Sequence, residues 1–176
     1  MNGSSITSGV INPSRLGSNT TNAASFLRGD ELWSLVSGSA ANIYLFDVAM
    51  HAALSNNILY TFLGANSPEV SVVAGQKVLV TVTARQGTNG TGGASLNRLN
   101  IGHQQQGSTT IVEQLSDWMG ICTIFQNTRL PFTLRQIFLN LPTGSYYFGM
   151  IYQADRAEGA KWNSNEWSRG QVTIVN

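Results

Sequence analysis

The chain has 176 residues and a mass of 19.0 kDa, which is long enough for one domain with a sizeable core. Charged residues make up only 11%, less than half of the usual share of about 25%. With a net charge of +1 and no cluster of Lys or Arg, the sequence provides no broad field for nucleic acid or an anionic membrane. Such a surface is more typical of a subunit in an assembly than of a free monomer.

The first residues, MNGSSITSG, lack the basic and apolar segments of a secretion signal. No apolar run approaches the ~20 residues of a membrane span. We therefore expect a product made soluble inside the cell. The single cysteine, Cys122, lies in an apolar run and is predicted to be a small core residue rather than a reactive thiol.

Residues 1–28 read as an extended arm of Asn, Ser, Thr and Gly, and residues 29–176 as the folded domain. A polar arm cannot order itself by burying its own apolar surface, so we expect it to lie along a neighbouring subunit. The anchors would be its spaced apolar residues Ile6, Val10, Ile11 and Leu16. The tripeptide Arg28-Gly29-Asp30 matches an integrin-recognition sequence, but Asp30 is better interpreted as the cap of a short helical turn at Glu31–Val36.

Short stretches of alternating apolar and polar residues, separated by turn-forming residues, predict a β-sandwich or barrel. The first of these stretches, Asn42–Met50, can also be read as a buried helix that continues to Leu54. Gln86–Gly93 is predicted to be a flexible loop and residues 103–107 a polar turn. The predicted strands are Asn42–Met50, Ile58–Leu63, Glu69–Val73, Gln76–Thr83, Ser95–Gly102, Thr109–Leu115, Gly120–Gln126, Phe132–Leu141, Gly144–Gln153 and Gln171–Val175.

The hairpin formed by Phe132–Leu141 and Gly144–Gln153 is predicted to be the centre of the core. Alternation puts Tyr146, Phe148, Met150 and Tyr152 on one face of its second strand. Both faces are largely apolar, whereas a sheet with one solvated face should be polar there. A second copy of the chain would cover the remaining face, which makes Tyr147 and Tyr152 candidate interface residues.

Nothing in the sequence identifies an active site. The nine carboxylates form no recognisable acid–base pair, and the two histidines, His51 and His103, lack metal-ligand spacing. No nucleophile elbow, phosphate-binding loop or dinucleotide fingerprint occurs. We expect no catalytic residues, no metal and no cofactor, and therefore a protein that is not an enzyme.

The most distinctive polar and aromatic cluster is GAKWNSNEWSR, before the last strand. A sugar site needs a flat aromatic face and amide or carboxylate partners for hydroxyl groups. The alternative is that the two tryptophans plug the end of the sandwich or a subunit contact. The candidate binding residues are Trp162, Asn163, Asn165, Glu166 and Trp167.

From about Val78 onward the sequence resembles the jelly-roll modules of phage tail-fibre tips, capsid spikes and head-decoration proteins, which are similar to the trimeric tumour-necrosis-factor fold. The resemblance rests on the turn LPTGSYYFG at Leu141–Gly149 and on the closing VTIV strand. It implies an antiparallel jelly-roll sandwich that works as a virion structural protein. It also implies a homotrimer, virion partners and a virion location.

Two other functions stay open beside that reading. One is a carbohydrate-binding, lectin-like module, since lectins also use jelly rolls, with a host-surface glycan as its partner. The other is a hydrolase. No specific nucleic acid and no membrane are expected as partners.

Overall fold

A computed structural model describes residues 25–27, 33–35, 41–49, 54, 59–96, 98–113, 122–154 and 158–175. The chain divides into two units, Met1–Ser39 and Ala40–Asn176, and each is described by itself. In the first unit, β1 (Ser25–Leu27) pairs antiparallel with β2 (Trp33–Leu35). The helical turn predicted at Glu31–Val36 is therefore wrong, because pairing with β1 gives the backbone of β2 partners that a single helical turn leaves unsatisfied.

Several predictions fall on residues outside the described ranges. They concern the arm as a whole, its anchors, and the tripeptide that follows it. These residues are Ile6, Val10, Ile11, Leu16, Arg28, Gly29 and Asp30.

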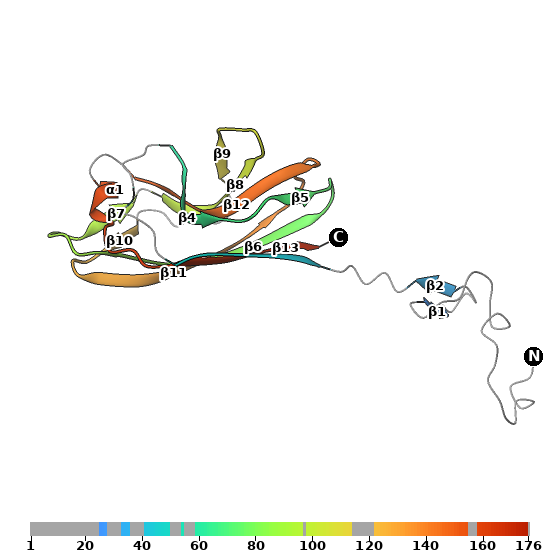
Figure 1. Ribbon diagram of the computed structural model, residues 1–176, viewed down its shortest axis with the longest axis horizontal. Helices are drawn as coiled ribbons and strands as arrows, with labels where there is room; N and C mark the ends of the chain where they lie inside the picture. Colours follow the sequence, from blue (N-terminus) through green and yellow to red (C-terminus); the bar gives the residue numbers. More distant parts are fainter. Residues whose placement is uncertain are drawn as a thin grey trace, which may run out of the picture. The chain divides into compact units, whose positions relative to one another are not determined.

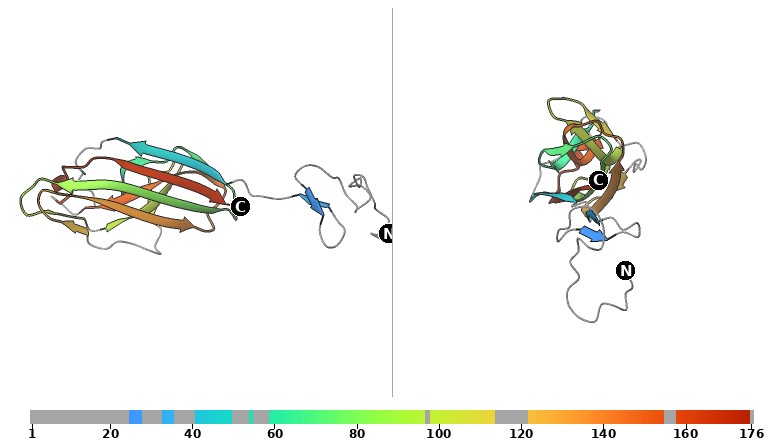
Figure 2. Two further views of the ribbon diagram at one scale, coloured as in Figure 1. Left: turned by 90° about the horizontal axis from the view of Figure 1, so that it is seen from below. Right: turned by 90° about the vertical axis from the view of Figure 1, so that its right-hand side faces the viewer.

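Two antiparallel sheets face each other across the core of the second unit (Figure 1). The four-stranded sheet has the order β11 (Thr128–Phe138), β6 (Lys77–Thr88), β13 (Ser168–Val175) and β3 (Asn42–Val48). Figure 2 shows these strands side by side in the left view. The five-stranded sheet has the order β4 (Thr61–Asn66), β12 (Gly144–Gln153), β8 (Arg98–Gln105) and β9 (Ile111–Glu113), with β5 (Val70–Val72) also paired to β12.

A ribbon of β7 (Ala94–Leu96) and β10 (Cys122–Ile124) and the short helix α1 (Glu158–Lys161) lie at one end of the sandwich (Figure 1). The chain is thus nearly all β and folds as an antiparallel jelly-roll sandwich, as predicted. The segment after Asn42 is a strand and not a helix.

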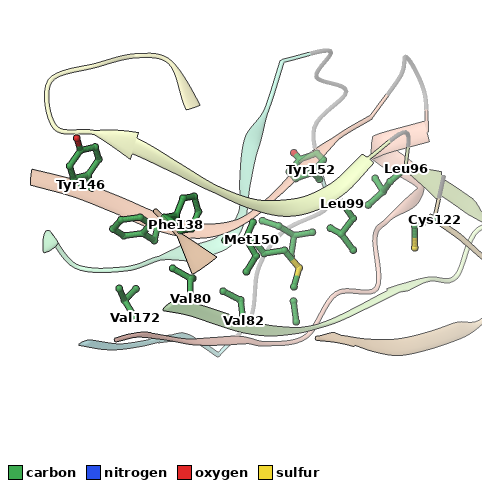
Figure 3. Packing of buried hydrophobic residues seen from close by; sticks show 14 of the residues in the cluster. Val80, Val82, Leu96, Leu99, Cys122, Phe138, Tyr146, Met150, Tyr152 and Val172 are labelled. Carbon is green, nitrogen blue, oxygen red and sulfur yellow. The ribbon is translucent and has the colours of Figure 1, made fainter. Parts of the chain in front are cut away.

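The core forms where the alternating apolar faces of the two sheets meet. Val80, Val82 and Val172 of one sheet point toward the other sheet, and Met150 and Leu99 of that sheet point back into the same core (Figure 3). Burying such a side chain contributes roughly 1.5–3 kcal/mol. Every second residue of β12 from Tyr146 to Tyr152 is buried, which confirms the predicted inward face of this strand. The predicted hairpin is wrong: β11 pairs with β6 in one sheet and β12 with β4, β5 and β8 in the other, so the turn between them connects the two sheets.

Several elements have other bounds than the sequence predicted, notably at the ends of the long strands. β6 continues to Thr88 because Gln86, Gly87 and Thr88 pair with the start of β11, so the loop predicted from Gln86 begins only after Thr88. β8 continues to Gln105, which pairs with Tyr146, so part of the predicted polar turn is strand. The predicted strand Ser95–Gly102 is divided between β7, which pairs with β10, and β8. The helix α1 was not predicted.

Cys122 is buried, as predicted, and its burial raises the pKa of the thiol to about 11. Such a group remains a protonated thiol at neutral pH and is a poor nucleophile.

The outer face of the five-stranded sheet does not need a second copy to cover its apolar side chain. Ile151 is fully buried there, and its methyl groups lie where a Cβ on Gly102 would stand. Glu113 of β9 accepts hydrogen bonds from Tyr60, from Arg98 (3.0 Å) and from Asn100 (2.9 Å) across this face. The cover comes from the same chain, which removes the reason given for a second copy on this face of β12.

The two tyrosines proposed for a subunit interface have different surroundings. Tyr152 faces inward and is buried in the core, so its assignment to an interface is wrong. Tyr147 lies on the outward face of β12 and is half-buried.

His103 lies among three aromatic rings of the core. Its ring makes edge contacts with Phe138 (5.3 Å between centroids) and Tyr146 (5.6 Å), and it also lies near Phe148. The Nδ1 atom is buried and has no hydrogen-bond partner among the described residues. This burial lowers the pKa of His103 below its ordinary value, because the charged imidazolium loses solvation.

We expect the domain to lose stability as the pH falls below about 6.5, the pKa of an unfolded histidine. The unfolded chain binds a proton there before the folded chain does. The loss continues until the lower, folded-state pKa of His103 is passed, at no more than about 1.4 kcal/mol per pH unit. Urea unfolding between pH 8 and pH 5 should show this slope, His103→Gln should flatten it, and His51→Gln should retain it. An unchanged slope in His103→Gln would contradict the assignment.

Candidate functional site

The segment predicted as a binding loop lies at the end of the sandwich that carries α1 (Figure 1). It follows α1 and runs antiparallel to the end of β6, which extends the sheet beyond β13. Ser164 N donates to Gly87 O (3.1 Å), Glu166 N donates to Arg85 O (3.0 Å), and Arg85 N donates to Trp167 O (2.8 Å). The loop is therefore fixed by backbone hydrogen bonds at regular intervals.

Two of the five predicted binding residues hold the loop from inside. Trp162 is 0% exposed, packs edge-on against Phe132 at 6.1 Å between ring centroids, and offers no face to a sugar. Asn165 is buried too, where its amide donates to Trp162 O (2.7 Å) and accepts from Gly87 N (3.3 Å). For these two residues the prediction of ligand contact is wrong, and the alternative of a plug at the end of the sandwich holds.

Gly87 makes this close approach of the loop to β6 achievable. A Cβ at this position would stand 2.4 Å from Arg129 Cγ and 2.8 Å from the carbonyl oxygens of Ser164 and Thr128. No side chain fits between the loop, β6 and β11.

The other three predicted residues remain at the surface. Asn163 is exposed and accepts a hydrogen bond from Asn89 N (3.1 Å). Glu166 is half-buried, and Trp167 is half-buried with the Arg169 guanidinium 5.4 Å from its ring centroid. The structure thus places an aromatic ring, an amide and a carboxylate on one short loop.

Glu166 is the centre of a charged cluster with two arginines from neighbouring strands. It accepts from Arg85 Nη1 at 2.7 Å and from Arg129 Nη1 at 3.0 Å. Arg129 also donates to Ser164 Oγ through Nε (2.8 Å) and Nη2 (2.6 Å). Three bonds fix the Arg129 guanidinium, so little side-chain entropy is left for a ligand to remove.

A hollow with a volume of about 360 Å³ lies beside this cluster. This is within the usual range of about 300–1,000 Å³ for small-molecule sites. Its lining supplies guanidinium, amide and hydroxyl groups, all of which can hydrogen-bond to a hydroxyl-rich ligand. The lining residues are Arg85, Thr88, Asn89, Asn127, Arg129 and Ser164.

An exposed aromatic residue stands on the turn that contributes Asn127. Phe125 is 83% exposed, the highest value among the large hydrophobic side chains described. Asn127 adopts a left-handed backbone conformation (φ 57°), as asparagine does more readily than most residues, and this reverses the chain from β10 into β11. The turn holds a flat apolar ring within two residues of the hollow.

Sequence reasoning missed Phe125, Arg85 and Arg129. The two arginines occupy outward positions of β6 and β11, and only the register of these strands with the loop brings them to Glu166. Among the described residues no three metal-ligating side chains gather, and no helix is both long and apolar enough to cross a bilayer.

No family model matches the chain, and no curated protein matches it. The solved structures that are similar to it include two at 14% and 15% identity. One is the C-terminal CBM6 of LamC, a marine laminarinase from Zobellia galactanivorans, with 77% of this chain and 99% of that chain covered and a TM-score of 0.29. The other is the carbohydrate-binding module CBM6cm-2 from Cellvibrio mixtus lichenase 5A in complex with cellotriose, with 74% and 98% covered and a TM-score of 0.25.

The prediction of a virion structural protein is contradicted, since the two solved structures named above are carbohydrate-binding modules and not virion proteins. At such low identity no residue role passes from them to this chain. The sequence resemblance to phage and viral jelly-roll modules, and the virion location inferred from it, stay untested predictions.

Proposed function

We propose that this chain is a carbohydrate-binding domain and that it binds glycan at the end of the sandwich carrying α1. The observation that carries the proposal is the hollow of about 360 Å³, lined only by planar polar and hydroxyl side chains, with the exposed Phe125 two residues before the lining residue Asn127. Trp167, which is half-buried, follows Glu166 on the same loop. Flat rings support the apolar face of a sugar, and the amides and guanidiniums support its hydroxyl groups.

We propose binding without catalysis at this site. Glycoside hydrolysis usually needs two carboxyl groups that flank the bond to be broken. Among the described side chains of the hollow and its charged cluster, Glu166 is the sole carboxylate, and it accepts from two arginines.

Phe125→Ala is expected to weaken glycan binding about tenfold, which corresponds to the loss of about 1.4 kcal/mol of ring contact. Because Phe125 is exposed, its removal should leave the melting temperature nearly unchanged. Val73→Ala is the matched control, since Val73 is also exposed but precedes the opposite end of β6. Calorimetric titration with a glycan selected on an array measures both variants, and equal affinities for wild type and Phe125→Ala would contradict this placement.

We also propose that the domain self-associates through the outer face of the four-stranded sheet. Strand register puts Ile137, Leu79 and Ile43 in one row across this face, and Leu45, 71% exposed, in the next row. A solvated sheet face is expected to be polar, so this patch favours burial against a partner.

The charges at the two edges of the patch favour a second copy as that partner. Arg135 lies on β11 at one edge and Asp47 on β3 at the other, one row apart in the register, and Arg169 of β13 stands opposite Asp47 within the same sheet. Two such faces could pack together around a twofold axis parallel to the strands. In that arrangement β3 of each copy lies over β11 of the other, which brings Asp47 of one copy close to Arg135 of the other. The threefold arrangement implied by the sequence resemblance remains the alternative.

Leu45→Ser together with Ile137→Ser should shift the protein toward monomer, while the fold remains, because both side chains are exposed. Sedimentation equilibrium at micromolar concentration measures the shift. The matched control is Leu59→Ser, which removes an equally exposed leucine beside the five-stranded sheet. A wild-type protein that sediments as a stable monomer overturns the self-association.

A further inference from the structure

The charge of the hollow is uneven. Two of its lining residues, Arg85 and Arg129, are cationic, and none of the described lining residues is acidic. Glu166 pairs with both guanidiniums, so the three charged groups together carry a net charge of +1. The nearby Lys161 does not change this sum, because it is paired with Glu158.

The two arginines have different roles in this arrangement. Arg129 is held by all three of its nitrogen positions, two on Ser164 Oγ and one on Glu166. Arg85 donates to Glu166 through Nη1 alone, as far as the described residues go, and its side chain is 43% exposed. Arg85 therefore has donors left that face solvent beside the hollow, while Arg129 supplies a fixed positive charge next to them.

A neutral sugar does not need this excess of charge. Hydroxyl groups are satisfied by Asn89, Asn127 and Ser164, which also line the hollow. A planar guanidinium with free donors matches the two oxygens of a carboxylate or a sulfate, and hydrogen bonds between charged partners are roughly twice as strong as neutral ones.

We propose that the site selects an anionic glycan, one that carries a uronate carboxylate or a sulfate ester, and that Arg85 binds the anionic group. This inference rests on the proposed carbohydrate binding at the same hollow. The sugar ring next to the anionic residue lies along the Asn127 side of the hollow. Arg129, locked by Ser164 and Glu166, raises the local positive potential without moving.

The test is calorimetric titration of the full chain with three oligosaccharides of equal length: cellohexaose, hexagalacturonate and a sulfated galactan hexaose. At low salt we expect at least one of the two anionic ligands to bind about tenfold more tightly than cellohexaose. Raising the NaCl concentration should weaken binding of the anionic ligand and leave any binding of cellohexaose unchanged. The two anionic ligands separate carboxylate from sulfate as the source of the charge.

Arg85→Gln should reduce the affinity for the anionic ligand to that for cellohexaose. Lys77→Gln, which removes one positive charge at the opposite end of β6, controls for net charge and should keep the preference. Equal affinity for neutral and anionic ligands, or a preference that survives in Arg85→Gln, overturns the selectivity and leaves carbohydrate binding in place. Failure of the protein to bind any of the three ligands and any glycan on an array overturns the proposed function as well.

Discussion

Replacing Trp162 by Ala is expected to lower the free energy of unfolding by about 3–5 kcal/mol, the usual cost of removing a large buried aromatic side chain. Trp162 has the largest fully buried side chain among the described residues. Its ring packs against Phe132 with 6.1 Å between the ring centroids. Its carbonyl accepts hydrogen bonds from Asn165 Nδ2 and from Leu54 N. A cavity at Trp162 would therefore loosen the connection that holds α1 and the binding loop to the sandwich.

Urea unfolding followed by far-UV circular dichroism measures this loss, and Trp167→Ala is the matched control. Trp167 lies five residues later, but it is half-exposed, so its removal should cost less than about 1 kcal/mol. Trp162→Phe should fall between the two, because it keeps an aromatic ring and gives up an indole Nε1 that has no acceptor among the described residues. Equal losses for Trp162→Ala and Trp167→Ala would contradict the separation of one structural from one surface tryptophan.

The sequence was sufficient to predict the sandwich because its strongest strands carry a period-2 pattern with few interruptions. Val78, Val80 and Val82 all face inward, as alternation requires, and so do Phe148 and Met150. The strand ends were predicted less well. Residues 86–88 look like a loop by composition, yet Gln86 and Thr88 are buried, because β11 pairs with them across the sheet.

The candidate site was only partly predictable, since composition does not distinguish the two tryptophans of the loop. Which of them faces inward depends on how residues 162–167 align with the end of β6, and this alignment is a contact between distant parts of the chain. The same holds for Arg85 and Arg129, which lie about 80 and 35 residues before their shared partner Glu166. Local periodicity contains no information about such pairs.

The surroundings of Gly144–Gln153 were predicted less well for a related reason. Both faces of this segment are largely apolar in sequence, so its outward face was expected to need cover from a second copy of the chain. Gly102 on β8 leaves the space that Ile151 fills, and Glu113 bonds across the same face. Neither contribution can be recognised before the pairing of β8 with β9 and β12 is known.

Gly87→Ala is expected to lower the free energy of unfolding by about 2–3 kcal/mol, as overpacking a tight site commonly does. The added methyl group would meet two carbonyl oxygens, of Ser164 and Thr128, at 2.8 Å. Neither carbonyl oxygen can move away without breaking hydrogen bonds, because both belong to backbone that is paired with the end of β6. The methyl group would also displace Arg129 Cγ, which stands 2.4 Å away, and would disturb the bonds of this side chain to Ser164 and Glu166.

Gly90→Ala is the matched control, because it adds the same methyl group three residues later in the chain. There the nearest atom would be Thr88 Oγ1 at 3.5 Å, an ordinary contact, so the free energy of unfolding should change by less than about 0.5 kcal/mol. The two variants should also differ in ligand binding, measured well below the melting temperature of each. Gly87→Ala should lose affinity for the anionic glycan because Arg129 is displaced, whereas Gly90→Ala should keep it. If Gly87→Ala proves as stable as Gly90→Ala, the close contact between the loop and β6 at Gly87 is contradicted. The fixed position of Arg129 beside Ser164 and Glu166 is then contradicted as well.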